Sequence, residues 1–348
     1  MKKITIISIV LFTAIQFRCF AQDIHFSQFN EAPMLLNPAL TGAFNGDHRA
    51  ILNYKNQWGS VAKPYQTYAF SYDAGLFKQK LQTGYLGIGI SVFKDIAGDM
   101  KFGTTQANLS VAYHQELNEN NELTAGIQGG YTGRSLDPSG EQWDNQYDGI
   151  SGFDGSLPSG ETSTFQNFSY GDFSGGLVWN YFSKEMYSTA NNALKLNLGG
   201  CVEHINQPKL SFYQMKDDKL WLKYAVHGGA WIGIKNTNTS IIPSAVFWKQ
   251  GSSQEITAGS MFRFRLKEES KYTGFVKEFA FSLGGFYRVN DAVIASTQFE
   301  LGSWALGMSY DVNVSGLKAA SNGRGGLEVY LRYISPNPFK TKTNKSFY

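Results

Sequence analysis

Apolar and polar side chains alternate along most of the chain after Asp47. Between Leu306 and Val314, every even position is apolar, and the odd positions carry glycine, serine, aspartate and asparagine. Similar runs recur throughout this region, as from Gln106 to Glu116. Because successive side chains of a β-strand point to opposite faces, a period of two predicts strands with one apolar and one polar face.

The lengths of these runs separate two classes of β protein. Strands of soluble proteins cluster near about 5 to 6 residues, whereas tilted strands that cross a membrane need about 9 to 11. A sheet inside a membrane must also close, because each unpaired backbone group in hydrocarbon costs several kcal/mol. Many runs here have the longer length, so we expect an all-β fold, a transmembrane antiparallel β-barrel of about 14 strands. The expected strands are Arg49–Trp58, Tyr65–Asp73, Gly84–Lys94, Phe102–Leu117, Glu122–Ser135, Ser169–Phe182, Leu194–Ile205, Trp221–Lys235, Ser240–Lys249, Glu255–Lys267, Phe275–Val289, Ala292–Gly302, Ser303–Val314 and Gly326–Ile334.

The stretch from Gln22 to Asp47 has no clean helical or strand period. Pro33 and Pro38 interrupt it, and aromatic side chains such as Phe26 are interleaved with polar ones. We expect an irregular N-terminal segment. It either packs into the mouth of the barrel as a plug, serves as a docking surface, or is a simple lead-in to the first strand.

The first residues predict a secretory signal peptide. Lys2 and Lys3 form its positive region, and an apolar run of about 14 residues follows, short of the roughly 20 that a spanning helix needs. Small residues precede a cleavage position before Gln22. The chain then retains only Cys201, so no intrachain disulfide is expected.

Composition supports a membrane barrel over a large soluble β-sandwich. The 348 residues include 37 Gly, 26 Phe and 19 Tyr, and only 17% are charged. Barrels use aromatic residues at the two membrane interfaces. The net charge of +3 and the lack of a basic run argue against a nucleic-acid partner.

Link lengths predict an orientation. The links at 118–121 and 236–239 are tight and polar, whereas 136–168 is long. Long extracellular loops and short periplasmic turns are the rule in such barrels, so we expect both chain termini in the periplasm. The predicted organisation is a signal peptide (1–21), an N-terminal periplasmic or plug segment (22–47), an outer-membrane β-barrel (48–335) and a basic periplasmic C-terminal tail (336–348).

Candidate chemistry is weak. No pair of histidines has the spacing of a zinc-protease motif, and no Gly-x-Ser-x-Gly motif marks a serine nucleophile. Asp144 to Asp154 departs from a calcium loop, so we expect no catalytic residue, metal or cofactor. Charged residues of both signs fall on the predicted inner face, which favours an ion-paired or plugged lumen over a wide pore. These are Glu116, Lys195, Glu203, Lys223, Arg263, Arg265, Glu278, Glu300, Asp311, Glu328 and Arg332.

Several motifs resemble the PorP/SprF family of the type IX secretion and gliding machinery of Bacteroidetes. They are the start at Gln22–Phe29, the block Leu36–Gly42, and the strand that carries Arg49, Tyr54 and Gln57-Trp58. The resemblance is specific over about residues 22 to 75, and Ile24 stands where the family often has proline. The candidate partner or plug residues are His25, Phe26, Gln28, Phe29, Asn37, Pro38, Gly42, Gln57 and Trp58.

The resemblance implies a non-enzymatic outer-membrane barrel that supports type IX secretion or gliding motility, by delivering or anchoring a surface adhesin. The implied partners are a periplasmic ring or peptidoglycan-linked protein of the type IX system and the C-terminal signal of a secreted adhesin. The alternatives are a passive porin, which needs an open lumen, and a barrel-embedded hydrolase, which needs a nucleophile and base.

Overall fold

The computed structural model describes residues 23–335, apart from 60–62, 79–80, 82, 99, 138–141, 148, 150–151, 161–166, 184–190, 211–218, 268–277 and 317. The predicted signal peptide and the predicted tail lie outside the described residues. No helix in the described part of the chain is long and apolar enough to span a membrane. The strands are β1 (His48–Gln57), β2 (Tyr65–Leu76), β3 (Gly84–Ala97), β4 (Phe102–Glu116), β5 (Asn121–Ser135), β6 (Phe168–Phe182), β7 (Leu194–Glu203), β8 (Lys223–Gly233), β9 (Thr239–Gln250), β10 (Ser253–Lys267), β11 (Phe279–Arg288), β12 (Ala292–Leu301), β13 (Trp304–Asn313) and β14 (Arg324–Ile334).

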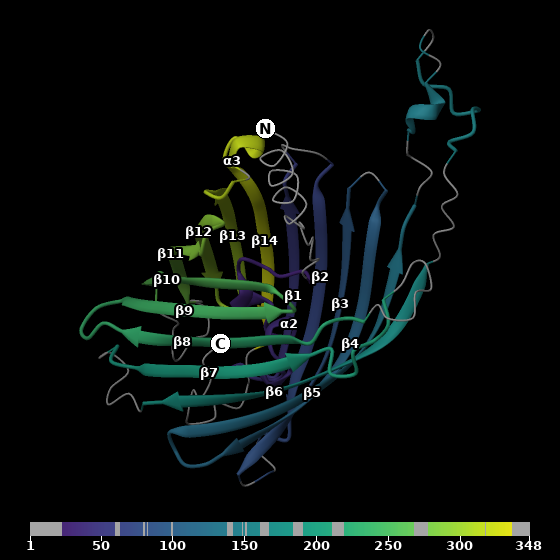
Figure 1. The fold of residues 1–348 in the computed structure, drawn as a ribbon. Helices are drawn as coiled ribbons and strands as arrows, with labels where there is room; N and C mark the ends of the chain where they lie inside the picture. The colour runs from purple at the N-terminus through teal and green to yellow at the C-terminus, as the bar shows by residue number, and fades with distance from the viewer. Residues whose placement is uncertain are drawn as a thin grey trace, which may run out of the picture.

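The strands form a closed antiparallel barrel (Figure 1). Each strand pairs with its neighbours in sequence, and β1 closes the sheet by pairing with β14 along nine residue pairs. The fold class, the strand number and the place of every predicted strand are confirmed. The strand ends differ from the predicted ones by a few residues, because alternation weakens where a strand leaves the wall.

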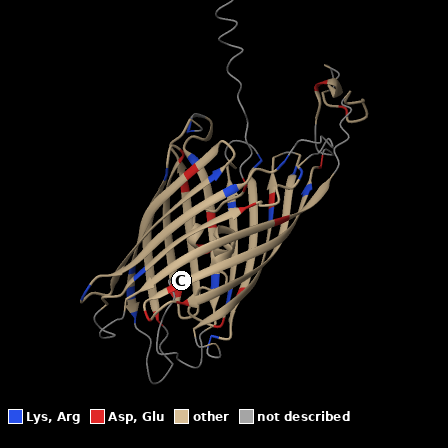
Figure 2. Cartoon of the chain, turned by 60° about the horizontal axis from the view of Figure 1, so that its bottom comes forward, with Lys and Arg blue, Asp and Glu red and all other residues tan. Residues whose placement is uncertain are grey.

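The two faces of the wall differ in polarity, as the alternation predicts. On β13, Leu306 and Met308 are each 41% exposed on the outer face, whereas Ser309 and Asp311 point inward and are 3% and 2% exposed. Figure 2 shows few charged residues along the middle of the wall and more towards the ends of the strands. An apolar outer face suits contact with lipid.

Three short helices precede the barrel strands and lie inside the barrel (Figure 1). They are η1 (Phe29–Glu31), α2 (Pro33–Leu36) and η2 (Pro38–Leu40). Pro33 and Pro38 occupy the first turns of α2 and η2, where the missing N–H of proline costs no hydrogen bond. The prolines therefore divide the segment into short turns that are too irregular to show a period.

The barrel has two unlike ends. At the long-link end, β5 and β6 are joined by 136–167, which carries η4 (Asp144–Gln146), and β13 and β14 are joined by a link with α3 (Lys318–Ser321). At the tight-turn end, β4 and β5 are joined by 117–120, and β12 and β13 by 302–303.

The ends of the described chain lie at opposite ends of the barrel. Asp23 contacts Gln250 at the end of β9, at the long-link end, whereas Ser335 accepts a hydrogen bond from Asp47 beside the start of β1, at the tight-turn end. The periplasmic location of both chain termini stays a prediction, because residues 1–22 and 336–348 lie outside the described part of the chain. The number and order of the strands predict only at which end of the barrel the first strand begins and the last strand ends. They do not show that the segment before the first strand crosses the lumen.

Candidate functional site

Residues 23–47, here called the lumen segment, run through the inside of the barrel. Buried backbone N–H and C=O groups must find partners, and an irregular segment cannot supply them all itself. Wall side chains provide many of them. Gln128 donates to the carbonyl of Met34 at 3.2 Å, and the thiol of Cys201 donates to the carbonyl of Leu36 at 3.1 Å. The wall therefore binds the main chain of the segment as well as its side chains.

Asp23 anchors the segment at the long-link end. Its carboxylate accepts a hydrogen bond from His204 Nε2 at 2.5 Å, and Asp172 accepts one from Nδ1 at 2.8 Å. Burial alone lowers the pKa of His204, but the hydrogen bonds to Asp172 and Asp23 raise it to about 10. Burial raises the pKa of Asp23, but the hydrogen bond and charge of His204 outweigh it and hold that pKa well below its usual range. The contact is therefore ionic at neutral pH.

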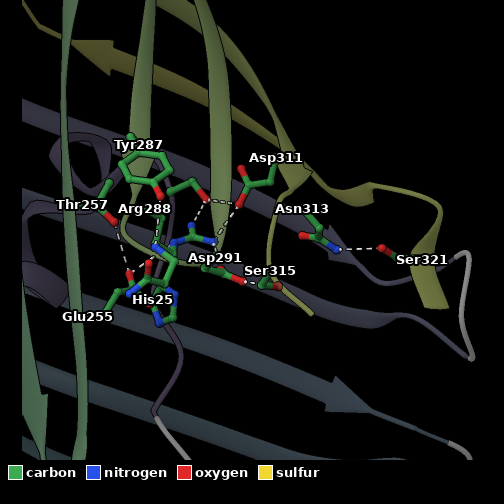
Figure 3. A network of polar contacts seen from close by, with 12 residues as sticks. His25, Glu255, Thr257, Tyr287, Arg288, Asp291, Asp311, Asn313, Ser315 and Ser321 are labelled. Carbon is green, nitrogen blue, oxygen red and sulfur yellow. Dashed lines mark hydrogen bonds and ion pairs between the residues drawn. The ribbon is translucent and has the colours of Figure 1, made fainter. Parts of the chain in front are cut away.

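His25 lies between wall residues of three strands. Its Nε2 is 3.0 Å from the Glu255 carboxylate, and its ring centroid is 5.5 Å from that of Trp248. Its carbonyl accepts a hydrogen bond from Lys55 Nζ at 2.9 Å. Figure 3 shows His25 and Glu255 beside Arg288, within one polar network at this end of the lumen.

Ser27 and Gln28 are held by acidic wall residues. Glu328 accepts from the backbone N–H of Ser27 at 2.8 Å and from that of Gln28 at 3.1 Å. The Ser27 hydroxyl donates to Asp311 at 2.8 Å and accepts from Arg288 at 2.5 Å. Buried charges are stable only when paired and hydrogen-bonded, and this segment supplies part of that pairing.

Phe26 and Phe29 pack against different sides of the lumen. Phe26 joins a small apolar cluster with Phe93. Phe29 is 3% exposed and meets Trp248 and Phe286 edge-on, with ring centroids 6.1 Å and 6.0 Å apart. Edge-to-face contacts of this kind are favourable for aromatic pairs. The two phenylalanines therefore bridge the lumen from one wall to the other.

Asn37 is fully buried in the middle of the barrel. Its amide donates to the carbonyls of Leu177 and Gly200 at 3.2 Å and 3.3 Å, and its Oδ1 accepts from the Ala39 N–H at 2.9 Å. The last contact caps η2, which begins at Pro38. One amide therefore both starts a helical turn and ties it to two strands.

Gly42 lies where no other residue fits. Its φ is +78°, and a Cβ there would lie 2.8 Å from the Cα of Gly87. Its N–H donates to Asp73 at 2.8 Å. The same carboxylate accepts from Arg49 Nε and Nη2 at 3.0 Å and 2.7 Å, and Nη2 also donates to the carbonyl of Leu40 at 3.2 Å. The bidentate pair of Arg49 and Asp73 therefore binds the chain on both sides of the turn, at Leu40 and at Gly42.

Lys78 fixes the segment at the tight-turn end. Its Nζ donates to the carbonyls of Phe44 and Gly46 at 3.0 Å and 2.6 Å, and it lies 5.2 Å from the ring centroid of Tyr85. Burial lowers the pKa of Lys78 to about 8. Lys78 therefore holds the last residues of the segment in place just before β1 begins.

Three wall glycines allow the lumen segment to approach the backbone of the wall. A Cβ on any of them would overlap an atom of the segment, so these positions accept only glycine without a shift of the chain. We call them the contact glycines. The pairs are Gly87 with Thr41, Gly126 with Ala39, and Gly176 with Asn37.

Gln57 and Trp58 stand apart from the other candidates. Gln57 ends β1 at the long-link end, in the wall. Trp58 follows with a φ of +59°, donates its backbone N–H to Gly325 and packs edge-on against Tyr65 at 5.1 Å between ring centroids. The other seven candidates all lie in the lumen segment, spread along its length.

The expected ion pairing of the lumen is confirmed. Opposite charges from neighbouring strands, or from a strand and the lumen segment, lie within hydrogen-bond distance. The pairs include Lys223 with Glu203 at 3.1 Å, Arg263 with Glu300 at 2.6 Å and Arg332 with Glu31 at 2.7 Å.

The lumen segment packs against the inner face of the wall in the described part of the chain. Inward-facing residues of widely separated strands, such as Ser110, Ala225 and Ile294, are at most 1% exposed. A cavity of about 20 Å³, enough for one water molecule, lies between the segment and β8 to β10. A passive porin needs an open lumen, so this packing counts against that alternative.

Among the described residues, no group of three or more His, Cys, Asp or Glu side chains is placed to hold a metal ion. In the stretch from Asp144 to Asp154, which was compared with a calcium loop, Asp144 begins η4 and Asp148 lies outside the described residues.

Sequence reasoning missed the wall residues that hold the segment. Arg49, Asp73, Lys55 and Arg288 were absent from the predicted inner-face charges, although each falls on the inner face of its strand and is at most 5% exposed. Strand parity applied to every charged residue finds them. Parity does not find His204, which follows the end of β7.

Several solved barrels resemble the fold at low sequence identity. The TodX monoaromatic hydrocarbon channel deltaS2 mutant matches with 10% identity, 87% of this chain and 93% of that chain covered, and a TM-score of 0.46. A Pseudomonas aeruginosa FadL homologue matches with 10% identity, 85% and 92% covered, and a TM-score of 0.44. CdiB from Escherichia coli matches with 10% identity, 82% and 63% covered, and a TM-score of 0.44.

No curated protein matches the chain. The family described as type IX secretion system membrane protein PorP/SprF matches residues 18–333, which include the lumen segment and nearly the whole barrel. The match extends far beyond the N-terminal motifs that suggested it. The chain therefore belongs to the PorP/SprF family of type IX secretion system membrane proteins.

Proposed function

We propose that this outer-membrane barrel supports type IX secretion as a closed scaffold and conducts no solutes. It delivers or anchors a surface adhesin at one end and docks to periplasmic type IX components at the other. The single observation that supports this role best is the lumen segment, which crosses the barrel and packs against inward-facing residues of widely separated strands. The role needs no catalytic group.

The orientation that fits this role has the long-link end outside the cell. Long links of bacterial barrels usually face outward and tight turns face the periplasm. The link 136–167 is then available to the adhesin. The tight-turn end, with the start of β1 and Ser335, is then available to a periplasmic ring or peptidoglycan-linked protein.

Deletion of the gene followed by surface proteomics tests the proposal. We expect loss of one large adhesin from the cell surface, restored by the wild-type chain. Loss of small-solute uptake with an unchanged surface proteome would contradict it. Purified protein in planar bilayers should carry no large steady current, and such a current would favour the porin alternative.

A further inference from the structure

Residues 23–28, here called the strap, form the first part of the lumen segment at the long-link end. The wall holds the strap largely by its main chain. Glu328 accepts the backbone N–H groups of Ser27 and Gln28, and Lys55 donates to the carbonyl of His25. Backbone N–H and C=O groups are common to nearly all residues of a peptide. Two wall side chains therefore hold the strap by groups that other peptides also present.

The charged wall groups that hydrogen-bond the strap are also paired with one another, in part as Figure 3 shows for Arg288 and Asp311. The pairs are Lys55 with Glu328 at 3.0 Å, Arg288 with Asp311 at 3.0 Å, and His204 with Asp172 at 2.8 Å. A buried charge that loses its only partner destabilises a protein strongly. These six groups keep an oppositely charged partner when the strap is absent, so its departure avoids that cost.

The rest of the lumen segment is held differently. Glu31 itself supplies a carboxylate to the guanidinium of Arg332, at 2.7 Å. Asn37 is fully buried, and the contact glycines lie directly against the main chain of residues 37–41. Removing this part would break a buried ion pair and open the packed core. The segment therefore has a strap that opens locally and a core part that stays in place.

We propose that the strap occupies a peptide-binding site at the long-link end of the lumen, and that a peptide of a partner on that side replaces it there. The peptide presents a carboxylate to His204, as Asp23 does, and an aromatic ring in the place of Phe26. It also presents a backbone N–H to Glu328, as Ser27 does. That the peptide belongs to an exported protein rests on the proposed function, whereas the site itself does not.

Binding of a synthetic peptide to the purified full chain in detergent tests the site. The probe is a fluorescent, acetylated peptide with the sequence of residues 23–30. The chain carries Asp23→Asn with Ser27→Pro, which weakens its own strap, because Asn has no charge for His204 and Pro has no N–H for Glu328. Heat-modifiable migration on gels shows whether this variant is folded. The matched control is the same peptide with Ser27→Pro, which needs no further change in the barrel.

We expect the variant chain to bind the probe at least about tenfold more tightly than the wild type, whose strap competes for the site. The control peptide should bind the variant about tenfold more weakly than the probe, because it lacks one hydrogen bond to a charged group. Equal affinities of the two peptides, or of the two chains, would overturn the proposal. So would a folded variant that binds neither peptide.

Hydrogen exchange of the wild-type chain provides a measurement that does not depend on folding of the variant. Residues 23–28 should exchange at least about tenfold faster than residues 36–42, because the strap opens without the core part. Equal protection of the two stretches would overturn the proposal. An unchanged surface proteome after gene deletion would contradict the proposed function and leave the peptide site standing, so the two failures are distinguishable.

Discussion

Gly126 on β5 faces the backbone of Ala39 so closely that a side chain on Gly126 would overlap the Ala39 nitrogen. This contact joins the middle of the wall to the middle of the lumen segment. The segment and the wall are therefore in direct contact through their main-chain atoms, with no side chain between them.

A methyl group at this contact should destabilise the barrel. We expect Gly126→Ala to cost about 1–3 kcal/mol, because an overpacked site forces the backbone to shift. Gly133→Ala on the same strand is the matched control, since a Cβ there meets nothing nearer than 4.0 Å. Urea unfolding in detergent, followed by the loss of heat-modifiable migration, measures the difference. Equal midpoints for the two variants would contradict the close fit.

The buried pair of Arg49 and Asp73 should be essential to the folded state. Both side chains are 1% exposed, so Asp73→Asn leaves an unpaired buried charge, which typically costs about 3–5 kcal/mol. The exposed pair of Lys101 and Asp137 provides the control, because Asp137→Asn should change stability little. The same unfolding assay compares them. A small effect of Asp73→Asn would show that water reaches Arg49.

The contact between Asp23 and His204 should depend on pH. The raised pKa of His204 gives stability that is complete below about pH 6.5 and is lost as pH rises towards about 10. The lowered pKa of Asp23 gives stability that is complete above about pH 3.8 and is lost as pH falls below it. The contact between Asp23 and His204 should therefore be strongest between about pH 3.8 and about pH 6.5.

Hydrogen exchange of residues 23–30 measures the anchor directly. We expect exchange to accelerate above its intrinsic pH dependence as pH rises from about 7 to about 10, and His204→Gln to abolish this extra rise. His48→Gln, at the opposite end of the barrel, should leave the profile as in the wild type. An identical profile for His204→Gln and the wild type would exclude the ionic contact as the cause.

Phe29 should contribute more to stability than a phenylalanine on the outer face. Phe29→Ala removes a buried ring between Trp248 and Phe286, and such truncations cost about 3–5 kcal/mol. Phe262 is 45% exposed on the outer face of β10, so Phe262→Ala is the control. Comparable losses for both variants would mean that Phe29 does not support the lumen packing.

The barrel could be predicted from the sequence because its signal is repeated in every strand. A closed sheet in lipid requires long strands with two unlike faces, and residues such as Leu306 and Ser309 report these faces independently. The inner ion pairs follow from the same parity. Every strand therefore supports the same prediction, a closed barrel with an apolar outer face and a polar inner face.

The course of the lumen segment could not be predicted in this way. Its contacts join residues far apart in sequence, such as Asp23 with His204, and they have no period. Pro33, Pro38 and Gly42 indicate turns but not the direction of the chain between them. Only the wall side chains fix that direction, so the crossing of the lumen appears only in three dimensions.

The pairing of β1 with β14 is not the only link between these two strands. The lumen segment precedes both strands in the sequence and contacts both of them. Asn53 and Lys55 of β1 donate to its carbonyl groups, and Glu328 and Arg332 of β14 bind its backbone N–H groups and Glu31. The two strands that close the barrel are therefore joined twice, by their own backbone hydrogen bonds and through the segment that both of them hold.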